Sequence, residues 1–373
     1  METFKNLGVT PKLIKGLSEM GIVNPTEIQQ AVIPRLLEGS QDLVGQAQTG
    51  TGKTAAYGIP ILERIDPSKK KVQALILSPT RELCQQVAKQ LFKYTKYTDK
   101  IFTEAVFGGE KIDIQIKRLS RPTHVIVATP GRLIDLQKRK VLDLSQVNIL
   151  VLDEADEMLS MGFKKELNTI LDTLSNVQNK WLFSATMPEG IRQIVNKYLS
   201  PEALKINTGR DSVVNKNIEH RFLRCEEIDK LPVLLDFLKT RPNGRGVVFC
   251  RTKNATSKLA KQLIAKNISA DAIHGDLLQK ERDKAMRAFK NKSLRLLVAT
   301  DLAARGIDVR GLAYVVHYQF PEHEEYYTHR SGRTARAGEE GVSLALVNSE
   351  EYKQLKQFEK SLNIAFSEIK QVR

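Results

Sequence analysis

Short apolar runs rich in β-branched residues alternate with amphipathic stretches along the whole chain of 373 residues. A nearly continuous apolar run of four to six residues is typical of a strand that is covered on both faces of a parallel sheet. The stretches between these runs repeat their apolar residues at the helical spacing. The pattern therefore predicts an α/β protein in which mainly parallel sheets are covered by helices on both faces.

This alternation of strands and helices runs through the chain twice. In the first series, the pattern predicts strands at Ala74–Ser78, Thr103–Phe107, His124–Ala128, Ile149–Asp153 and Lys180–Ser184, with helices at Gly52–Ile65 and Thr80–Tyr94. In the second, it predicts strands at Gly246–Arg251, Leu294–Thr300, Tyr314–Tyr318 and Gly341–Val347, with helices at Asn254–Lys266, Leu278–Lys290 and Glu350–Ser361.

The segment between the two series, Asn207–Asn217 (NTGRDSVVNKN), is polar and contains Gly, Ser and Asn. Such a composition is typical of a connection between domains. We therefore expect a first domain over residues 1–208, a linker over 209–217 and a second domain over 218–373. In each domain, ligands are expected beyond the carboxyl ends of the strands.

The composition excludes several classes of protein. Hydrophobic residues make up 41% of the chain and charged residues 27%, which is ordinary for a folded protein and too apolar for a disordered one. The sequence contains no uninterrupted apolar run of about 18 residues, and its first residues do not resemble a signal peptide. Its three cysteines, Cys84, Cys225 and Cys250, lie far apart and lack the spacing of metal ligands. We expect a cytoplasmic protein in a reducing compartment.

The charge of the chain is strongly basic, with 58 Lys and Arg against 43 Asp and Glu, a net +15. Residues 1–210 carry +7 of this excess and residues 211–373 carry +8. The even division argues against a single basic tail. It is compatible with two domains that both face a polyanion, and equally with two generally basic domains.

A phosphate-binding loop is indicated between Leu43-Val44 and the helix expected from Thr54 onward. The sequence there matches the Walker A pattern, although Ala47 stands where Gly is usual. Glycines let the loop curl so that its N–H groups point at one anion, while Lys53 bridges the β- and γ-phosphates and the Thr54 hydroxyl holds Mg²⁺. The nucleotide-binding residues expected here are Ala47, Gln48, Thr49, Gly50, Thr51, Gly52, Lys53 and Thr54.

Two carboxylates follow directly after the apolar run at 149–152. At the end of a strand, Asp153 is placed to hold Mg²⁺, directly or through water, and Glu154 to orient and deprotonate an attacking water. The alternative is an acidic helix N-terminus that is stabilised by the helix dipole. The order of a Walker A loop followed by a strand and an acidic pair favours nucleotide hydrolysis.

With these motifs, nearly the whole chain resembles the DEAD-box RNA helicases; residues 153–156 spell the family name. The resemblance implies two tandem RecA-like domains, ATP and Mg²⁺ as cofactors, and RNA-dependent ATP hydrolysis. Ile22–Gln29 (IVNPTEIQ) is similar to the family's adenine-recognising motif, in which Ile22 replaces the usual aromatic residue. The resemblance implies that Gln29 hydrogen-bonds the base and that Phe4 stacks on it.

The same resemblance implies an RNA site in each domain. The residues that it assigns to the RNA backbone are Pro79, Thr80, Arg81, Gly108, Gly109, Thr129, Pro130, Gly131 and Arg132 in the first domain, and Arg251, Arg282 and Thr300 in the second. Ser184 and Thr186 are expected to couple hydrolysis to strand separation. The implied partner is single-stranded or short duplex RNA, held largely independently of its sequence.

The block His329–Gly338 (HRSGRTARAG) carries arginines at every third position, which we expect on one side of the start of a helix. Arg330, Arg333 and Arg336 could form a solvated basic face. The resemblance instead makes Arg333 and Arg336 arginine fingers that complete the ATP site when the domains close, and makes Asp308 a ribose ligand. Two positions depart from the family, which typically carries Ile at Ser331 and Gly at Ala335.

The expected function is thus an ATP-dependent RNA helicase that separates duplexes locally and non-processively, or remodels RNA–protein complexes. Two alternatives stay open at this point: an ATP-locked RNA clamp with slow turnover, and a DNA-directed helicase of the same superfamily, against which the adenine-recognising motif and the DEAD residues argue. A non-catalytic basic RNA-binding protein would lack the nucleotide motifs.

Overall fold

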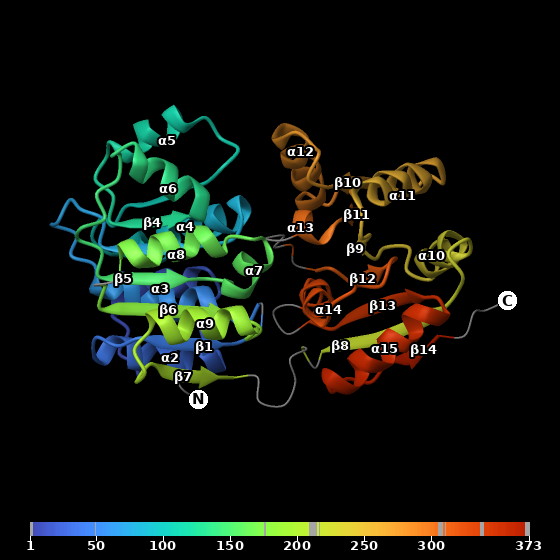
Figure 1. The fold of residues 1–373 in the computed structure, drawn as a ribbon, viewed down its shortest axis with the longest axis horizontal. Coiled ribbons are helices and arrows are strands. Elements are labelled where there is room, and N and C mark those ends of the chain that lie inside the picture. The colour runs from blue at the N-terminus through green and yellow to red at the C-terminus, as the bar shows by residue number, and fades with distance from the viewer. Residues whose placement is uncertain are drawn as a thin grey trace. The chain divides into compact units, whose positions relative to one another are not determined.

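The computed structural model describes residues 3–48, 50–174, 177–208, 215, 217–304, 309, 311–335 and 339–369. The chain forms two compact units, residues 1–210 and 211–373, which divide within the polar segment 207–217 (Figure 1). Each unit is built on one seven-stranded sheet in which all the paired strands are parallel. The α/β fold with two parallel-sheet domains is therefore confirmed.

The sheet of the first unit has the order β3-β4-β2-β5-β6-β1-β7. Its strands are β1 (Leu43–Gln46), β2 (Ala74–Leu77), β3 (Thr103–Val106), β4 (Val125–Ala128), β5 (Ile149–Leu152), β6 (Asn179–Ser184) and β7 (Leu204–Asn207). Its helices are α1 (Pro11–Glu19), α2 (Glu27–Glu38), α3 (Lys53–Arg64), α4 (Arg81–Tyr94), the 3₁₀ helix η1 (Thr95–Tyr97), α5 (Ile112–Leu119), α6 (Pro130–Lys138), α7 (Ala155–Ser160), α8 (Lys164–Thr173) and α9 (Glu189–Tyr198).

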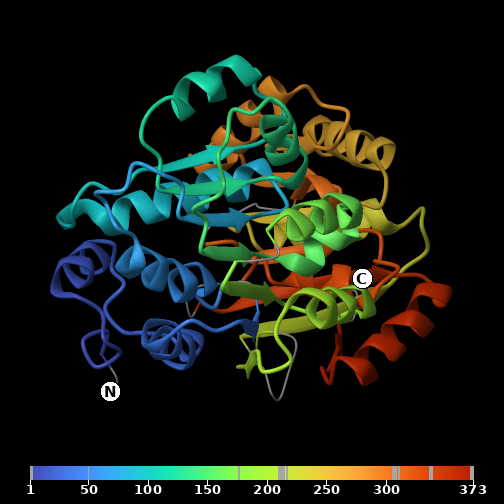
Figure 2. The ribbon, with the colours of Figure 1, turned by 60° about the vertical axis from the view of Figure 1, so that its left-hand side comes forward.

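Alternate residues of each central strand enter two different cores. In β2, Ala74 and Ile76 pack with the apolar residues of α1 to α4, whereas Leu75 and Leu77 pack with those of α6 to α9. The N-terminal helices of the first core are dark blue in Figure 2. Burial on both faces explains why these strands are apolar at every position.

The second unit repeats this plan with the sheet order β10-β11-β9-β12-β13-β8-β14. Its strands are β8 (Ile218–Arg224), β9 (Gly246–Phe249), β10 (Ala270–Ile273), β11 (Leu296–Ala299), β12 (Tyr314–His317), β13 (Gly341–Val347) and β14 (Ser367–Glu368). Its helices are α10 (Lys230–Lys239), α11 (Lys253–Ala265), α12 (Gln279–Lys290), α13 (Asp301–Ala304), α14 (Glu324–Ser331) and α15 (Ser349–Ser361). Residues of α10 and α11 fill one core, and those of α12 to α15 fill the cores of the other face.

All nine strands and five helices that the pattern predicted are present, with ends shifted by a few residues at most. Apart from β1, which was expected only as Leu43-Val44 before the phosphate loop, the pattern left β7, β8, β10 and β14 unidentified. Three of these are the edge strands β7, β10 and β14, and β8 lies next to an edge. In the described part of the chain, no helix has both the length and the apolar character needed to cross a membrane.

Candidate nucleotide and RNA sites

The phosphate loop joins β1 to α3 in the strand–loop–helix order that the sequence predicted. Gly50 and Gly52 have φ of 87° and 94°, in the left-handed region that favours glycine. A Cβ at Gly52 would also lie 2.3 Å from Nε2 of Gln29, so a side chain there would displace Gln29 from the loop. Of the eight residues expected to bind the nucleotide in this loop, all except Thr49 are among the described residues.

Lys53 is the first residue of α3, and its side chain folds back over the loop. Its Nζ donates a hydrogen bond to the carbonyl of Ala47 at 2.8 Å, and the residue is only 6% exposed. An ammonium group has three protons, so Lys53 keeps donors for phosphate oxygens while this bond fixes its direction. The loop is held at its other side by Ala47, whose N–H donates to the carbonyl of Ser184 at 3.1 Å.

Gln29 links the N-terminal segment to the phosphate loop. Its Nε2 donates to the carbonyl of Gly52 at 3.1 Å, and its Oε1 accepts from the N–H of Thr26 at 3.0 Å, within the capping box of α2. Phe4 is buried in the core with α1 and α2, and its 2% exposure leaves almost no surface for a base. Contacts of these two residues with adenine remain predictions from the resemblance.

Asp153 follows β5 and is buried at the carboxyl edge of the sheet. Its N–H donates to the carbonyl of Leu77, and its Oδ2 accepts a hydrogen bond from the Tyr57 hydroxyl at 2.8 Å. Burial, and then the negative charge of Glu154, raise the pKa of the Asp153 carboxyl to about 7, while Lys53 acts in the opposite direction. Tyr57 was not identified from the sequence; its position four residues after Lys53, on the same side of α3, was the available signal.

Glu154 has a left-handed backbone, with φ 50° and ψ 53°, which is uncommon for a residue other than glycine. Its Oε2 is buried and has no hydrogen-bond partner within the described residues. Strained backbone and an orphaned buried carboxylate oxygen each carry a free-energy cost, and they concentrate at functional sites.

The carboxylates of Asp153 and Glu154 fit a divalent cation. Burial first, and then repulsion from Glu154, raise the pKa of Asp153, and a bound cation would favour the ionised form of both carboxylates. Mg²⁺ prefers oxygen ligands and takes only one or two of them from the protein. The described residues contain no cluster of three or more His, Cys, Asp or Glu side chains around a common point.

Replacing Asp153 with Asn is expected to stabilise the nucleotide-free protein, although it removes a candidate Mg²⁺ ligand. The folded state holds a proton on Asp153 up to about pH 7, whereas the ordinary pKa is 3.8, so this carboxyl lowers the free energy of unfolding as pH rises through that window. We therefore expect the melting temperature of Asp153→Asn to exceed that of the parent by more at pH 8 than at pH 5. Equal gains at both values would refute a raised pKa.

The fourth residue of the acidic motif, Asp156, connects that motif to the predicted coupling residues. Its Oδ2 accepts hydrogen bonds from both the N–H and the hydroxyl of Thr186, each at 2.8 Å. The Asp156 N–H donates to the hydroxyl of Ser184 at 3.3 Å, and that hydroxyl donates to the carbonyl of Thr186 at 2.7 Å. These hydrogen bonds thus join the start of α7 to the end of β6 and the segment that follows it. Asp156 was given no role from the sequence.

The residues predicted to face RNA in the first unit follow β2, β3 and β4, which are adjacent at one end of the sheet. The nucleotide motifs follow β1, β5 and β6, in the remaining part of the same carboxyl edge. Thr80 caps α4 by accepting from the N–H of Leu83, and Thr129 precedes α6, which opens with Pro130 and Gly131. The sheet order therefore places the RNA motifs and the nucleotide motifs in two separate parts of the carboxyl edge. The sequence gives the order of these motifs along the chain but not this arrangement in space.

Several of these predicted RNA residues are held by contacts within the loops. Arg132 donates from Nη2 to the carbonyl of Glu110 at 3.0 Å, next to Gly108 and Gly109. The guanidinium of Arg81 lies 4.9 Å from the centre of the Phe107 ring. Gln115, which no sequence motif indicated, is fully buried and bonds both the N–H and the carbonyl of Phe107. The loop after β3 is therefore tied to α5 by Gln115 and to α6 by Arg132.

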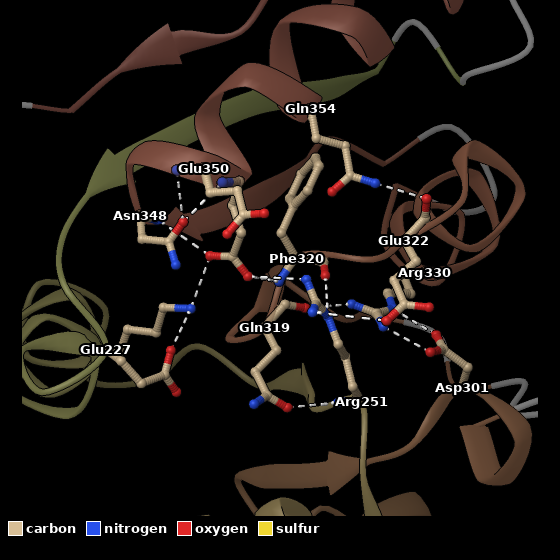
Figure 3. Close-up of polar contacts among 12 residues, drawn as sticks. Glu227, Arg251, Asp301, Gln319, Phe320, Glu322, Arg330, Asn348, Glu350 and Gln354 are labelled. Atoms are coloured by element: carbon tan, nitrogen blue, oxygen red, sulfur yellow. Dashed lines mark hydrogen bonds and ion pairs between the residues drawn. The ribbon is translucent and has the colours of Figure 1, made fainter.

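In the second unit, Arg251 is bound to acceptors of its own unit. Its Nε donates to the carbonyl of Phe320 at 2.7 Å, and its Nη2 lies 3.1 Å from a carboxylate oxygen of Glu351 (Figure 3). Glu351 also pairs with the fully buried Lys230 at 3.0 Å. The predicted RNA contact of Arg251 would therefore have to compete with Glu351 for the guanidinium.

The arginine spacing predicted that Arg330 and Arg333 project from the start of a helix, and this prediction is wrong. Arg330 is the second-last residue of α14 and is buried, and Arg333 lies in the turn that follows this helix. The spacing of three suggested a helical face because it matches the helical period, but α14 ends at Ser331. Arg333 is 5% exposed, and its Nε donates to the carbonyl of His329. Arg336 and Asp308 lie outside the described residues.

Arg330 is engaged entirely within its own unit. Its Nε and Nη2 bind the two oxygens of Asp301 at 2.5 and 2.7 Å, and its Nη1 donates to the carbonyl of Gln319 (Figure 3). Asp301 begins α13 directly after Thr300, which is 8% exposed at the end of β11. Arg282, the remaining residue predicted to face RNA, lies in the first turn of α12. Asp301 was missed, although its position after a strand was a usable signal.

Arg330→Leu is expected to lower the free energy of unfolding of the second unit by about 3–5 kcal/mol, because it leaves a carboxylate without its bidentate partner in a largely buried site. Urea denaturation of the variant and the parent would measure this. The double variant with Asp301→Leu should recover part of the loss, since no unpaired charge remains. If Arg330→Leu unfolds like the parent, the pair is not structural.

The departure at Ser331 is accommodated by a buried polar cluster. The Ser331 hydroxyl lies 2.9 Å from that of Ser343, which lies 3.0 Å from Nε2 of His317. Tyr327 stacks on His317 with ring centres 4.6 Å apart and bonds His220 at 2.6 Å. Burial lowers the pKa of His220 to about 4, and burial together with Arg330 lowers that of His317 well below its ordinary value. Hydrogen bonds among uncharged side chains thus fix α14 to the sheet at Ser331, the position at which the family typically carries Ile.

Comparison with known proteins agrees with this geometry. The DEAD/DEAH box helicase family matches residues 26–194, and the helicase conserved C-terminal domain matches residues 229–338. The chain is 41% identical to the DEAD-box ATP-dependent RNA helicase CshA of Bacillus cereus over 362 residues, which are 97% of this chain and 68% of that protein. This chain belongs to the DEAD-box ATP-dependent RNA helicases.

Solved structures of this family resemble the whole chain. Saccharomyces cerevisiae Dbp5 bound to RNA and ADP BeF₃ superimposes with a TM-score of 0.91 at 31% identity, covering 99% of this chain and 96% of that one. Mss116p bound to ssRNA and AMP-PNP gives a TM-score of 0.89 at 27% identity, covering 99% and 80%. Both similarities confirm the tandem RecA-like fold.

The chain is accordingly an RNA helicase and an ATPase. Within its first unit, the structure brings together Lys53, Thr54, Asp153 and Glu154 at the carboxyl edge, as the helicase motifs predicted. It adds Tyr57, Asp156 and Gln115 as residues that hold those motifs in place. In the second unit, the structure distinguishes Arg330, which is bound by both oxygens of Asp301, from Arg333, whose Nε donates to a backbone carbonyl.

Proposed function

We propose that ATP binds the loop after β1, where Lys53 contacts the β- and γ-phosphates and Glu154 orients and deprotonates the attacking water. The observation that carries this assignment is the buried Oε2 of Glu154, which has no hydrogen-bond partner among the described residues and belongs to a residue with left-handed backbone beside Asp153. A carboxylate in this state has no structural use for its free oxygen, and a general base needs one.

Thr54 and Asp153 are the residues that would hold Mg²⁺, which neutralises charge on the phosphate oxygens when bound. Hydrogen bonds within the chain orient the side chains at this site. The Tyr57 hydroxyl donates to Asp153, and Lys53 donates to the carbonyl of Ala47. Gln29 is proposed to contact the base and Asp308 the ribose; Phe4, which is 2% exposed, would have to turn out of the core to stack on the base.

We further propose that RNA, single-stranded or as a short duplex, is held mainly through its phosphates by both units. Two features support this: the near-equal positive charge of the two halves and the RNA-bound state of the relatives Dbp5 and Mss116p. Closure of the two domains on ATP and RNA would supply Arg333 and Arg336 to the γ-phosphate. Separation of strands is then local and non-processive, and loss of phosphate reopens the domains.

The rate of ATP hydrolysis, measured with matched RNA and DNA oligonucleotides, tests this function. Stimulation by RNA and not by DNA is expected, with an RNA affinity that falls steeply as salt rises because counterions are released. Equal stimulation by DNA would favour a DNA-directed helicase. Slow phosphate release with persistent RNA binding would favour an ATP-locked clamp.

The proposed compartment is the cytoplasm. All three cysteines are free, with Cys84 and Cys250 buried, as expected for a protein that folds under reducing conditions.

A further inference from the structure

A hollow of about 670 Å³ lies on the first unit between α1, the end of α4, η1 and the segment before β3. Its volume is within the range of about 300–1,000 Å³ that is usual for ligand sites. The residues that line it are Gly16, Glu19, Met20, Phe92, Lys93, Thr95, Lys96, Thr98, Lys100, Ile101 and Phe102.

The walls of the hollow present aromatic surface to water. Phe92 is 69% exposed and Phe102 is 45% exposed, and both line the same depression with Met20 and Ile101. Phe102 is also held in place, because its ring stacks on His124 with centres 5.8 Å apart and planes 13° from parallel. Exposed aromatic rings gathered around a concavity are typical of interaction sites.

The charge of the hollow is positive. Its one carboxylate, Glu19, is already taken up, since it accepts from Lys96 Nζ at 2.6 Å and from the Tyr97 hydroxyl. Lys93 and Lys100 have no carboxylate partner in the part of the chain that the structure describes. Two uncompensated ammonium groups therefore flank the aromatic walls and favour an acidic ligand.

The hollow is remote from the helicase motifs. Helix α4 begins beside the RNA motif at Thr80, on the carboxyl edge of the sheet, and its 14 residues end at Tyr94, about 20 Å away at the rise of an α-helix. Phe102 directly precedes β3 and so lies at its amino end. An occupant of the hollow would therefore leave both the nucleotide and the RNA motifs accessible.

We propose that this hollow binds an acidic peptide segment of a protein partner, anchored by one or two apolar side chains. The anchor would pack between Phe92 and Phe102, and flanking Asp or Glu residues would pair with Lys93 and Lys100. The hollow offers little for recognising nucleotide bases, because the hydroxyls of Thr95 and Thr98 already donate to the carbonyls of Phe92 and Thr95. A partner docked here would bring the helicase to a target without covering its catalytic edge.

Fluorescence anisotropy of the full chain tests the proposal with a labelled 12-residue peptide in which one Phe and one Leu are flanked by Asp and Glu. Saturable binding is expected, and it should weaken by about tenfold or more in Phe92→Ser and in the double variant Lys93→Glu, Lys100→Glu. The matched control is Lys165→Glu with Lys205→Glu, which makes the same charge change at exposed lysines of this unit outside the hollow. This control should bind the peptide nearly as the parent does.

Three results would overturn the proposal: no saturable binding, equal binding by the parent and the hollow variants, or equal weakening in the control. A labelled oligouridine is the second probe, and a loss of oligouridine binding in the hollow variants would assign the surface to RNA instead. RNA-stimulated ATP hydrolysis should stay unchanged in all these variants. Because peptide binding is measured without ATP, its outcome is independent of the proposed catalytic roles.

Discussion

Replacing Glu154 with Gln is expected to lower the turnover number of ATP hydrolysis by about 10²–10⁴-fold, the usual contribution of a positioned general base. The amide keeps the size and burial of the side chain, but it cannot accept the proton of water. Binding of ATP and of RNA should persist, so that complexes with both ligands become long-lived. Single-turnover hydrolysis and equilibrium binding of a fluorescent ATP analogue measure the two effects separately.

The matched control for this prediction is Glu189→Gln, the same chemical change at an exposed position of α9 in the same unit. It should hydrolyse ATP at nearly the parental rate. Hydrolysis within a few fold of the parent in Glu154→Gln would remove Glu154 as the base. Loss of ATP binding would mean that the Glu154 carboxylate is needed to bind the nucleotide and not only to accept a proton.

Arg333→Ala is expected to reduce RNA-stimulated turnover by about 10³-fold or more, the usual contribution of an arginine finger. ATP binding should change little, because the guanidinium acts on charge that develops in the transition state. The effect should therefore appear in kcat rather than in KM. Steady-state kinetics at saturating RNA provide the measurement.

Folding has to be separated from catalysis in this variant, since Arg333 is nearly buried and bonds the carbonyl of His329. Thermal unfolding of Arg333→Ala should show an intact second unit, in contrast to Arg330→Leu. Arg287→Ala, at an exposed position of α12, is the control for loss of one positive charge. A folded Arg333→Ala protein with parental kcat would show that Arg333 has only a structural role.

The fold was readable from the sequence where burial is complete. Strands such as β2 and β5 are apolar at every position because helices cover both faces, and that pattern is unmistakable. In β8, exposed polar residues interrupt the apolar ones, and β14 has only two residues. Such strands are specified by their neighbours in the sheet more than by their own residues, so the pattern did not reveal them.

The site was readable wherever a motif follows a buried strand, as at Asp153 and Glu154. The contacts of the side chains that hold the motifs were not readable, although the helical position of Tyr57 four residues after Lys53 was a signal. Tyr57 and Asp153 are 96 positions apart, and Asp156 and Thr186 are 30 apart, so their contacts exist only in the folded unit. The prediction of a helical face for Arg330 and Arg333 was wrong because it relied on local spacing alone. The spacing of three matches the helical period, but the helix ends at Ser331.

The two hydrogen bonds of Gln29 have a consequence for how nucleotide preference can be studied. One amide both completes the cap of α2 and supports the carbonyl of Gly52 in the phosphate loop. A substitution at Gln29 would loosen that helix and that loop together, and any change in affinity would mix misfolding with lost base contacts. Discrimination between purines is therefore better measured by varying the nucleotide, ATP against GTP or a purine analogue, on the unaltered protein.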